Sequence, residues 1–174
     1  MDAKAKHEAS AMNLTTMNLK SDREIIIART FDAPARIVFE AWTRPELVKR
    51  WWAPKSHGLS IVVCEADVRV GGRYRYVLRT TKDEEIGFSG QYTEVTPHSR
   101  LVYTQVFEPM ADAGAVTVAV TFEERAGKTH LVSHEIYPSP EAREAALASG
   151  MEHGMREAMD QLDALAGALA GAAT

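Results

Sequence analysis

The sequence has very little cysteine: Cys64 is the only one among its 174 residues. A lone cysteine excludes an internal disulfide, and no Cys-x-x-Cys pair or Cys/His cluster offers a thiolate metal site. Cys64 lies in an apolar stretch, where a small buried side chain is a better interpretation than a nucleophile without a histidine partner. This cysteine usage is typical of a reducing compartment, so we expect a cytoplasmic protein.

The sequence also lacks long hydrophobic runs, basic segments and nucleotide-binding motifs. No window approaches the roughly 18 apolar residues that a membrane span needs. The net charge of −4, with no basic run longer than two residues, provides no electrostatic footprint for nucleic acid or an anionic membrane. Gly71-Gly72 belongs to no GxGxxG or Walker pattern and is interpreted as a turn. We therefore predict no nucleic acid, no membrane and no cofactor.

What remains is the composition of one ordinary globular domain. Hydrophobic residues make up 45% of the chain and charged residues 25%, and the length leaves no room for a second sizeable domain. Residues 1–20 mix Ala, Lys, Asn, Thr and Met without a helical or strand period, so we expect a flexible leader there. Residues 21–170 are predicted to form the single domain.

The domain begins with the pattern of a strand followed by two short helices. The β-branched run in residues 23–31 predicts a strand, Pro34 opens an amphipathic helix, and Pro45 opens a second one. Between residues 58 and 137 the hydrophobic pattern changes to period two with regular turn residues, which is typical of an antiparallel meander. We place six further strands near residues 59–67, 72–80, 86–95, 100–107, 115–124 and 129–137.

The last segment is predicted to be a long helix with one apolar face. It begins after Pro138-Ser139-Pro140, where the composition turns to Ala, Glu, Met and Leu. A curved seven-stranded antiparallel sheet needs a cover, and this helix is the only element long enough to provide it. We therefore predict an α+β fold in which the sheet wraps around the helix and leaves a pocket between them. The apolar stripe contains Leu147, Met151, Met155, Met159, Leu162, Ala166 and Leu169.

Several motifs follow one another within residues 22–166. They are Arg29-Thr-Phe-Asp-Ala-Pro34, Ala41-Trp-Thr-Arg-Pro45, Trp51-Trp-Ala-Pro54, Asp67-Val-Arg-Val-Gly-Gly72 and Ser149-Gly-Met-Glu-His-Gly-Met155. The chain is similar to the SRPBCC (START-like) superfamily and, more narrowly, to homologues of the activator of the 90-kDa heat-shock-protein ATPase. This resemblance implies a helix-grip fold and a cavity for hydrophobic small molecules. Members range from lipid carriers to aromatase/cyclases to chaperone regulators of the stress response, so the fold alone does not assign a function.

Strand parity identifies the residues that line the predicted pocket. Alternate side chains share a face, and Arg73, Arg75 and Arg79 do not suit an apolar interior, so the tyrosines between them point inward. The same reasoning selects the valines of strand 115–124, whereas strands 86–95 and 100–107 have mixed faces that a bulge would shift by one residue. The predicted ligand-binding residues, including Trp52 from the family motif and the helical methionines, are Trp52, Tyr74, Tyr76, Phe88, Tyr92, Tyr103, Gln105, Val118, Val120, Glu135, Met151, Met155 and Met159.

Glu135 lies on a strand in which neither face is cleanly apolar. It shares a face with Leu131 and Ser133, and placing that face inside would point its carboxyl into the cavity. Burial would then raise its pKa and suit it to acid–base work or to hydrogen bonding with a ligand oxygen. The alternative is that Glu135 lies at the strand end, solvated or paired with an arginine.

The remaining candidates each have a plain structural interpretation. Trp52 either packs its short helix or forms the wall near the pocket entrance, and the methionine stripe serves either as core or as an adaptable ligand contact. His130 and His134, four residues apart on a strand, are too distant to share one metal ion. His57 is interpreted as an isolated surface histidine. We therefore predict no metal and assign no catalytic residue.

Three functions are compatible with these observations. The first is binding of a small hydrophobic or aromatic molecule, with tyrosine hydroxyls setting its orientation. The second is a cyclase-, hydrolase- or isomerase-type enzyme that uses Glu135 with cavity tyrosines. The third is a chaperone-ATPase regulator, which the family resemblance implies but which the absence of a second binding domain makes weaker. Edge strands and the Ala-rich last helix are compatible with a homodimer, although the sequence defines no interface.

Overall fold

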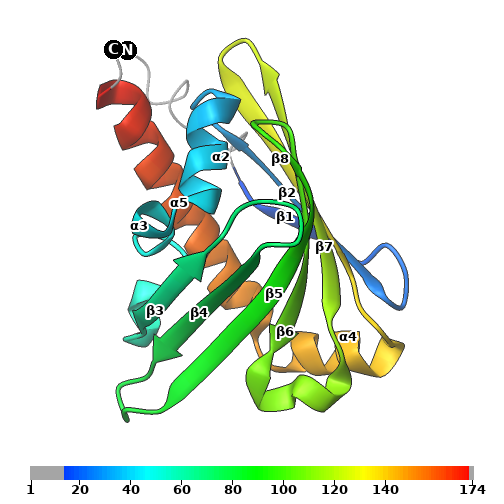
Figure 1. The fold of residues 1–174 in the computed structure, drawn as a ribbon. Helices are drawn as coiled ribbons and strands as arrows, with labels where there is room; N and C mark the ends of the chain where they lie inside the picture. The colour runs from blue at the N-terminus through cyan, green and yellow to red at the C-terminus, as the bar shows by residue number, and fades with distance from the viewer. Residues whose placement is uncertain (1–13, 173–174) are drawn as a thin grey trace.

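The structure, a computed structural model, describes residues 14–172, and in this part of the chain one antiparallel sheet bends around a long helix (Figure 1). Its eight strands have the order β1-β2-β8-β7-β6-β5-β4-β3, which confirms the α+β helix-grip prediction. The described helices contain no segment long and apolar enough to cross a membrane. The elements are β1 (Thr16–Asn18), β2 (Glu24–Phe31), α2 (Ala35–Thr43), α3 (Pro45–Val48), η1 (Lys55–His57), β3 (Ser60–Ala66), β4 (Arg73–Arg79), β5 (Glu85–Thr96), β6 (Arg100–Phe107), η2 (Glu108–Ala113), β7 (Val116–Arg125), β8 (Lys128–Ile136), α4 (Pro140–Ala148) and α5 (Met151–Ala172).

Strand β1 is absent from the sequence prediction of seven strands, because it lies inside the segment interpreted as a leader. It pairs antiparallel with β2, with Met17 opposite Ile27. Thr15 is buried beside it, and its backbone carbonyl accepts a hydrogen bond from Arg156 of α5. The three residues of β1 are too few to show a period, so pairing rather than pattern defines the strand. Residues 1–13, the rest of the predicted leader, lie outside the described residues.

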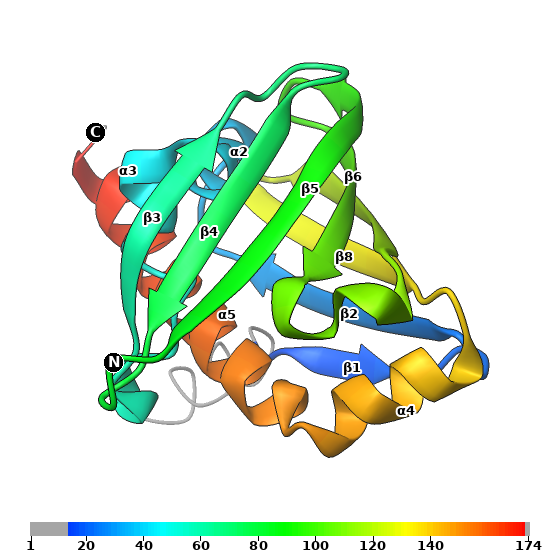
Figure 2. The same cartoon turned by 60° about the horizontal axis from the view of Figure 1, so that its bottom comes forward.

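The C-terminal segment forms two helices instead of the predicted single one. Helix α4 ends at Ala148, and Gly150 follows with a φ of +80°. This left-handed conformation is easily adopted by glycine and is a common way to end a helix. The chain then turns into α5, which lies against the concave face of the sheet, whereas α4 lies beyond the sheet's lower end (Figure 2). Of these two helices, only α5 contributes buried side chains, namely Ala158, Met159, Leu162, Leu165 and Ala166.

Strand parity predicts the concave face correctly. Tyr74, Tyr76 and Leu78 of β4 are buried, while the arginines that alternate with them are exposed. On β7 the inward residues Val118 and Val120 are likewise buried. Alternation therefore locates the core on these strands, although Val77 on the other face of β4 is buried as well.

A buried arginine fastens α5 to the sheet. Arg29 of β2 is 6% exposed and lies on the concave face, where its guanidinium contacts the carboxylates of Asp160 and Asp163 at 2.5 and 3.1 Å. The Thr15 hydroxyl accepts a third hydrogen bond from it, at 3.1 Å. These contacts offset part of the cost of burying a charge and fix where the helix crosses the sheet.

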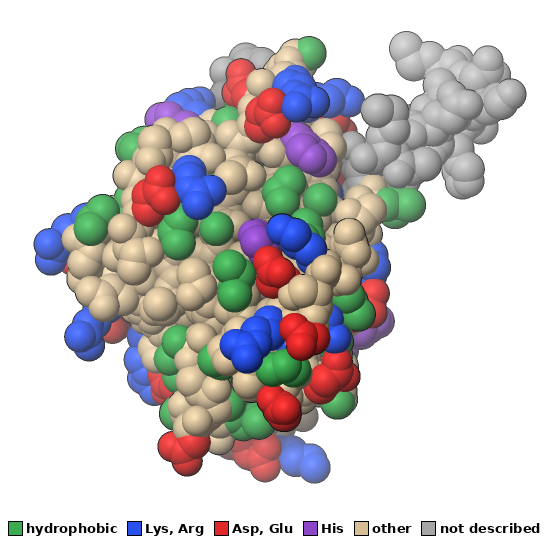
Figure 3. Space-filling model, turned by 90° about the vertical axis from the view of Figure 1, so that its right-hand side faces the viewer, with side chains coloured by type: hydrophobic (Ala, Val, Ile, Leu, Met, Phe, Trp, Pro, Cys, Tyr) green, Lys and Arg blue, Asp and Glu red, His purple; other side chains and the backbone are tan. Residues whose placement is uncertain are grey.

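The surface carries charges of both signs. On the face shown in Figure 3, acidic and basic side chains are interspersed, with apolar side chains between them. Exposed pairs such as Arg100–Glu94, 2.9 Å apart, join neighbouring strands. Pairs of this kind contribute about 0–1 kcal/mol each, so the fold depends on its interior rather than on them.

Candidate functional site

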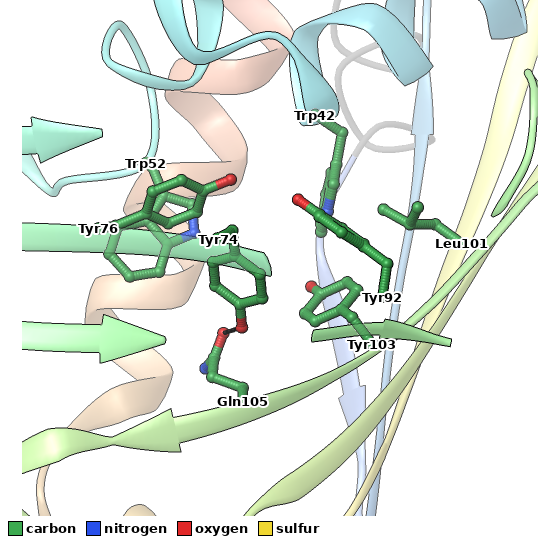
Figure 4. Close-up of a pocket in the computed structure, with 8 residues that line it drawn as sticks. All are labelled: Trp42, Trp52, Tyr74, Tyr76, Tyr92, Leu101, Tyr103 and Gln105. Atoms are coloured by element: carbon green, nitrogen blue, oxygen red, sulfur yellow. Dashed lines mark hydrogen bonds between the residues drawn. The ribbon is translucent and has the colours of Figure 1, made fainter. Parts of the chain in front are cut away.

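An aromatic cluster occupies the part of the concave face formed by β4, β5 and β6 (Figure 4). The rings surround a small cavity. The volume in which the centre of a water molecule fits is about 10 Å³, so the cavity has room for roughly one water. Tyrosines from the sheet form one side, and tryptophans from α2 and from the segment after α3 form the other. The lining residues are Trp42, Trp52, Tyr74, Tyr76, Tyr92, Leu101, Tyr103 and Gln105.

Strand register brings these tyrosines together. Tyr74 and Tyr76 alternate along β4, and Tyr92 of β5 pairs directly with Tyr103 of β6. The rings are in contact: the centroid of Tyr74 lies 5.1 Å from Tyr76 and 5.5 Å from both Tyr92 and Tyr103. Gly90 opposes Tyr74 and makes room for it, because a Cβ there would lie 2.7 Å from the Tyr74 ring. The cluster therefore depends on a glycine in the middle of a strand.

The hydroxyl groups point into the fold, where one pair of them contacts each other and the other two contact different partners. Tyr76 donates to the Tyr92 oxygen, and the Trp42 indole donates to the Tyr103 oxygen. The Tyr74 hydroxyl donates to the Thr104 carbonyl at 2.9 Å and lies 3.3 Å from the Gln105 side-chain oxygen. In the part of the chain that the structure describes, no acceptor is assigned to the protons of Tyr92 and Tyr103. Both can therefore donate to an incoming oxygen.

Burial keeps these phenols neutral. Loss of solvation raises the pKa of Tyr92 to about 12, and raises the pKa values of Tyr74, Tyr76 and Tyr103 further. Neighbouring phenols add to the shifts of Tyr74 and Tyr76. At neutral pH the cavity therefore presents protonated hydroxyls, which donate hydrogen bonds, and contains no phenolate nucleophile.

The sheet is interrupted beside this cavity. The β5–β6 register has pairs at Ser89–Val106 and Tyr92–Tyr103, but none at Gly90 and Gln91. The backbone N–H of Gln91 donates instead to the Thr104 hydroxyl at 3.1 Å. On the outer face this interruption opens into a groove of about 470 Å³, and Tyr74 borders both the groove and the inner cavity.

Glu135 points inward, so the interpretation as a solvated or arginine-paired residue is wrong. It shares its face with the buried Leu131 and Ser133, and its carboxylate accepts a hydrogen bond from Tyr137 at 3.0 Å. The residue keeps some exposure, yet burial of the carboxyl raises its pKa to about 6, with the Tyr137 hydrogen bond acting in the opposite direction. Glu135 therefore titrates close to neutral pH.

The structure brings only some of the predicted ligand-binding residues to the cavity. Trp52, the four strand tyrosines and Gln105 line it. The helical methionines do not, because α2 and the segment after α3, rather than α5, lie over this part of the sheet. The other predicted residues lie elsewhere: Phe88 stacks against Trp52 and Phe107, Val118, Val120 and Met159 are core, Met151 and Met155 are half-buried on α5, and Glu135 lies near Tyr137.

Two lining residues are missing from the sequence prediction. Strand parity places Leu101 on the inward face with Tyr103, but it is not among the predicted ligand-binding residues. Trp42 belongs to the family motif on α2, and only packing shows that its indole reaches the cavity.

Two other reactive side chains have surroundings that the structure defines. Cys64 is half-buried, its thiol contacts the Pro45 carbonyl at 3.5 Å, and burial raises its pKa to about 11, so it is protonated and unreactive at neutral pH. The sequence analysis interprets His57 as an isolated surface histidine, but the structure gives it two neighbours. Its ring centroid lies 5.4 Å from that of His153, and Glu157 lies beside both.

Comparison with solved structures shows the same fold in several bacterial proteins. A Rhodobacter sphaeroides protein superposes with a TM-score of 0.81 at 26% identity, covering 88% of this chain and 99% of that one. A Mycobacterium smegmatis protein has a TM-score of 0.76 at 26% identity over 87% and 96% of the two chains. A Staphylococcus epidermidis protein has a TM-score of 0.75 at 27% identity over 87% and 93%.

Family membership follows from the sequence itself. No curated protein matches the chain significantly. Residues 32–167, which contain the aromatic cluster and most of α5, match the family described as Activator of Hsp90 ATPase homolog 1-like protein. The match covers well over half of the chain and agrees with the helix-grip topology. The chain therefore belongs to the family of Activator of Hsp90 ATPase homolog 1-like proteins.

Proposed function

We propose that the protein binds one small aromatic molecule that carries an oxygen atom, in the cavity formed by the strand tyrosines. The observation that carries this proposal is the inward orientation of four phenols around one small cavity. Two of them, Tyr92 and Tyr103, keep a proton that no described residue accepts. The aromatic rings match a flat apolar ligand, and the free protons match its oxygen.

The cavity must enlarge before such a ligand enters, because it now has room for about one water. We infer that Trp52 is the wall that moves. Its indole is half-buried and contacts Tyr76 and Phe88 edge-on at 5.2 and 4.9 Å. The neighbouring Trp51 is 3% exposed and donates a hydrogen bond to the Ala41 carbonyl at 2.8 Å, so it is held firmly. Trp52 has no such bond among the described residues.

Burial and polar contacts would act together in this site. Removing roughly 300 Å² of apolar surface from water contributes about 7 kcal/mol before the costs of association. The cost of moving Trp52 is subtracted from this gain, so we expect modest affinity. A hydrogen bond to the ligand oxygen adds discrimination between otherwise similar rings. Families with this fold commonly bind hydrophobic ligands, which supports the assignment of the cavity as the site.

The direct test compares 2-naphthol with naphthalene, two probes that differ by one hydroxyl. Calorimetry and tryptophan fluorescence should show that 2-naphthol binds about tenfold more tightly, because its oxygen accepts from Tyr92 or Tyr103. Tyr92→Phe and Tyr103→Phe together should remove that preference while leaving naphthalene binding. Tyr137→Phe is the matched control, since Tyr137 is a buried phenol outside the cavity lining. Equal loss in the control, or no binding of either probe, would reject the proposal.

A catalytic role for Glu135 is the second candidate, favoured by its raised pKa and by its electrostatic influence on Tyr103. A carboxyl that titrates near pH 6 can exchange a proton with a bound molecule at neutral pH. If the protein is an enzyme, Glu135→Gln should abolish turnover while naphthol binding persists. Retained turnover would exclude Glu135 as the acid or base.

Family membership favours one more function, regulation of a chaperone ATPase. Exposed apolar side chains on this chain, such as Phe107 and Met110, lie close together at the start of η2 and offer a contact surface. Addition of the protein to a 90-kDa heat-shock chaperone should then change its ATPase rate. Phe107→Asp should cancel the effect; an unchanged rate with the wild-type protein rules the role out.

A further inference from the structure

Two histidines and a glutamate meet where the loop after α3 lies beside α5 (Figure 1). His57 is the last residue of η1, and His153 and Glu157 lie one turn apart on the same side of α5. One ligand atom from each side chain, two imidazole nitrogens and a carboxylate oxygen, lies within 4.8 Å of the other two. His57 is about 100 positions away in sequence from the other two residues, so only the fold brings it to them.

Other contacts fix the loop against the helix. The Ser56 amide donates to one carboxylate oxygen of Glu157 at 2.8 Å, and the Ser56 hydroxyl contacts the other at 2.5 Å. The Lys55 amide donates to the Gln161 side chain at 2.9 Å, one turn further along α5. The cluster is thus held without any contribution from the imidazoles.

The histidines themselves are free to bind something else. Both are exposed, and within residues 14–172 neither imidazole has a hydrogen-bond partner. The carboxylate of Glu157 that they face is oriented by two hydrogen bonds from Ser56. A carboxylate oriented by a second residue, next to two imidazoles, is a ligand arrangement common at transition-metal sites.

We propose that His57, His153 and Glu157 bind one divalent transition-metal ion, of which Zn²⁺ is the representative. Imidazole nitrogen disfavours Mg²⁺ and Ca²⁺, which prefer oxygen ligands, and suits Zn²⁺. Bond lengths of 2.0–2.1 Å in a tetrahedral site place ligand atoms about 3.3 Å apart. The ligand atoms now lie within 4.8 Å of one another, and the two imidazole rings that must move closer are exposed. Three protein ligands leave one position for water or for a small ligand atom.

The bound ion would join the loop to α5 directly after Trp52. That loop, from Ala53 to His57, connects the proposed movable wall of the aromatic cavity to the metal ligands. The metal site nevertheless rests on its own residues and does not depend on the proposed aromatic ligand. Its test uses only the metal and the full-length, untagged protein.

Calorimetric titration of the chelator-treated protein with ZnCl₂ should show one ion per chain. His57→Ala and His153→Ala should each weaken binding by roughly tenfold or more, because each removes one of three ligands. Glu157→Gln should weaken it as well. Zn²⁺ should also raise the melting temperature of the wild-type protein but not that of the variants, since the metal binds only the folded ligand set. Co²⁺ in place of Zn²⁺ should give visible absorption bands that all three variants lose.

Two further histidine variants serve as matched controls. His130 is exposed on β8, far from the cluster in sequence and on another element, and His7 lies outside the described residues. His130→Ala and His7→Ala should bind Zn²⁺ like the wild-type protein. Far-UV circular dichroism confirms that each variant is folded. No heat of binding, binding that survives His57→Ala and His153→Ala, or binding that disappears with His7→Ala would each overturn the proposal.

Discussion

The concave face of the sheet has two halves that are equally buried but chemically different. The aliphatic half, on β2, β7 and β8, contains Ile25, Ile27, Val118, Val120 and Leu131, each at most 3% exposed. The aromatic half, on β4, β5 and β6, contains Tyr74, Tyr76, Tyr92 and Tyr103, each at most 9% exposed. Burial of the first set is favourable in itself, whereas the second must find partners for its hydroxyls.

This difference separates the half that stabilises the fold from the half that we propose as a ligand site. Helix α5 packs its buried side chains against the sheet, and Arg29 of β2 forms ion pairs with two of its aspartates. The aromatic half has α2, Trp42 and the half-buried Trp52 above it and keeps a small cavity. Interior polar groups that an aliphatic core would avoid are expected at functional positions. The comparison can be tested in each half separately.

The largest effect is expected in the aliphatic half. Leu131 is fully buried, so Leu131→Ala should remove about 3 kcal/mol from the free energy of unfolding, through lost burial and the cavity left behind. In the aromatic half, Tyr92→Phe should remove only about 1 kcal/mol, because the ring remains and one hydrogen bond is lost. Urea unfolding at neutral pH measures both. If both variants lost the same free energy of unfolding, the aliphatic half would not be the main source of stability.

The sequence predicts most strands of the sheet but misses one strand and one helix boundary. Strands β2 to β8 follow from alternation and turn residues, and parity places the tyrosines inside because arginines alternate with them. Strand β1 and the break at Gly150 are missed: the first is too short to have a period, and the second interrupts a continuous Ala-rich pattern.

The candidate site is harder to predict than the fold. Periodicity shows that Met151 and Met155 share the apolar side of α5, but not which half of the sheet that helix crosses. The crossing is set by tertiary contacts such as Arg29 with Asp163, which no local pattern contains. The cluster of His57 with His153 is invisible for the same reason, because its members lie on separate elements.

The next effect concerns the glycine on which the aromatic half depends. A Cβ at Gly90 would lie 1.7 Å from the Thr104 backbone oxygen and 2.7 Å from the Tyr74 ring. Gly90→Ala should therefore destabilise the protein by about 2 kcal/mol and disturb the tyrosine cluster, visible in near-UV circular dichroism. Gly167→Ala is the matched control: this exposed glycine of α5 has nothing within 4 Å of its Cβ position. It should stabilise the helix by up to about 1 kcal/mol. A harmless Gly90→Ala would mean that the cluster tolerates rearrangement.

The last effect has the opposite sign and reaches its full size only at one end of the pH range. Burial raises the pKa of Glu135 from 4.5 to about 6, so the folded protein holds this proton more tightly than the unfolded chain does. Between these pH values the native state binds more protons, and its stability falls as the pH rises and Glu135 ionises. Glu135→Gln removes that loss, so the variant should match the wild-type protein at pH 4 and exceed its stability by up to about 2 kcal/mol at pH 8. Tyr137→Phe should act the other way, because it removes the hydrogen bond that favours the ionised carboxyl and so raises the pKa of Glu135 further. Urea unfolding of the three proteins across this pH range measures both changes, and parallel pH profiles would place the carboxyl in solvent.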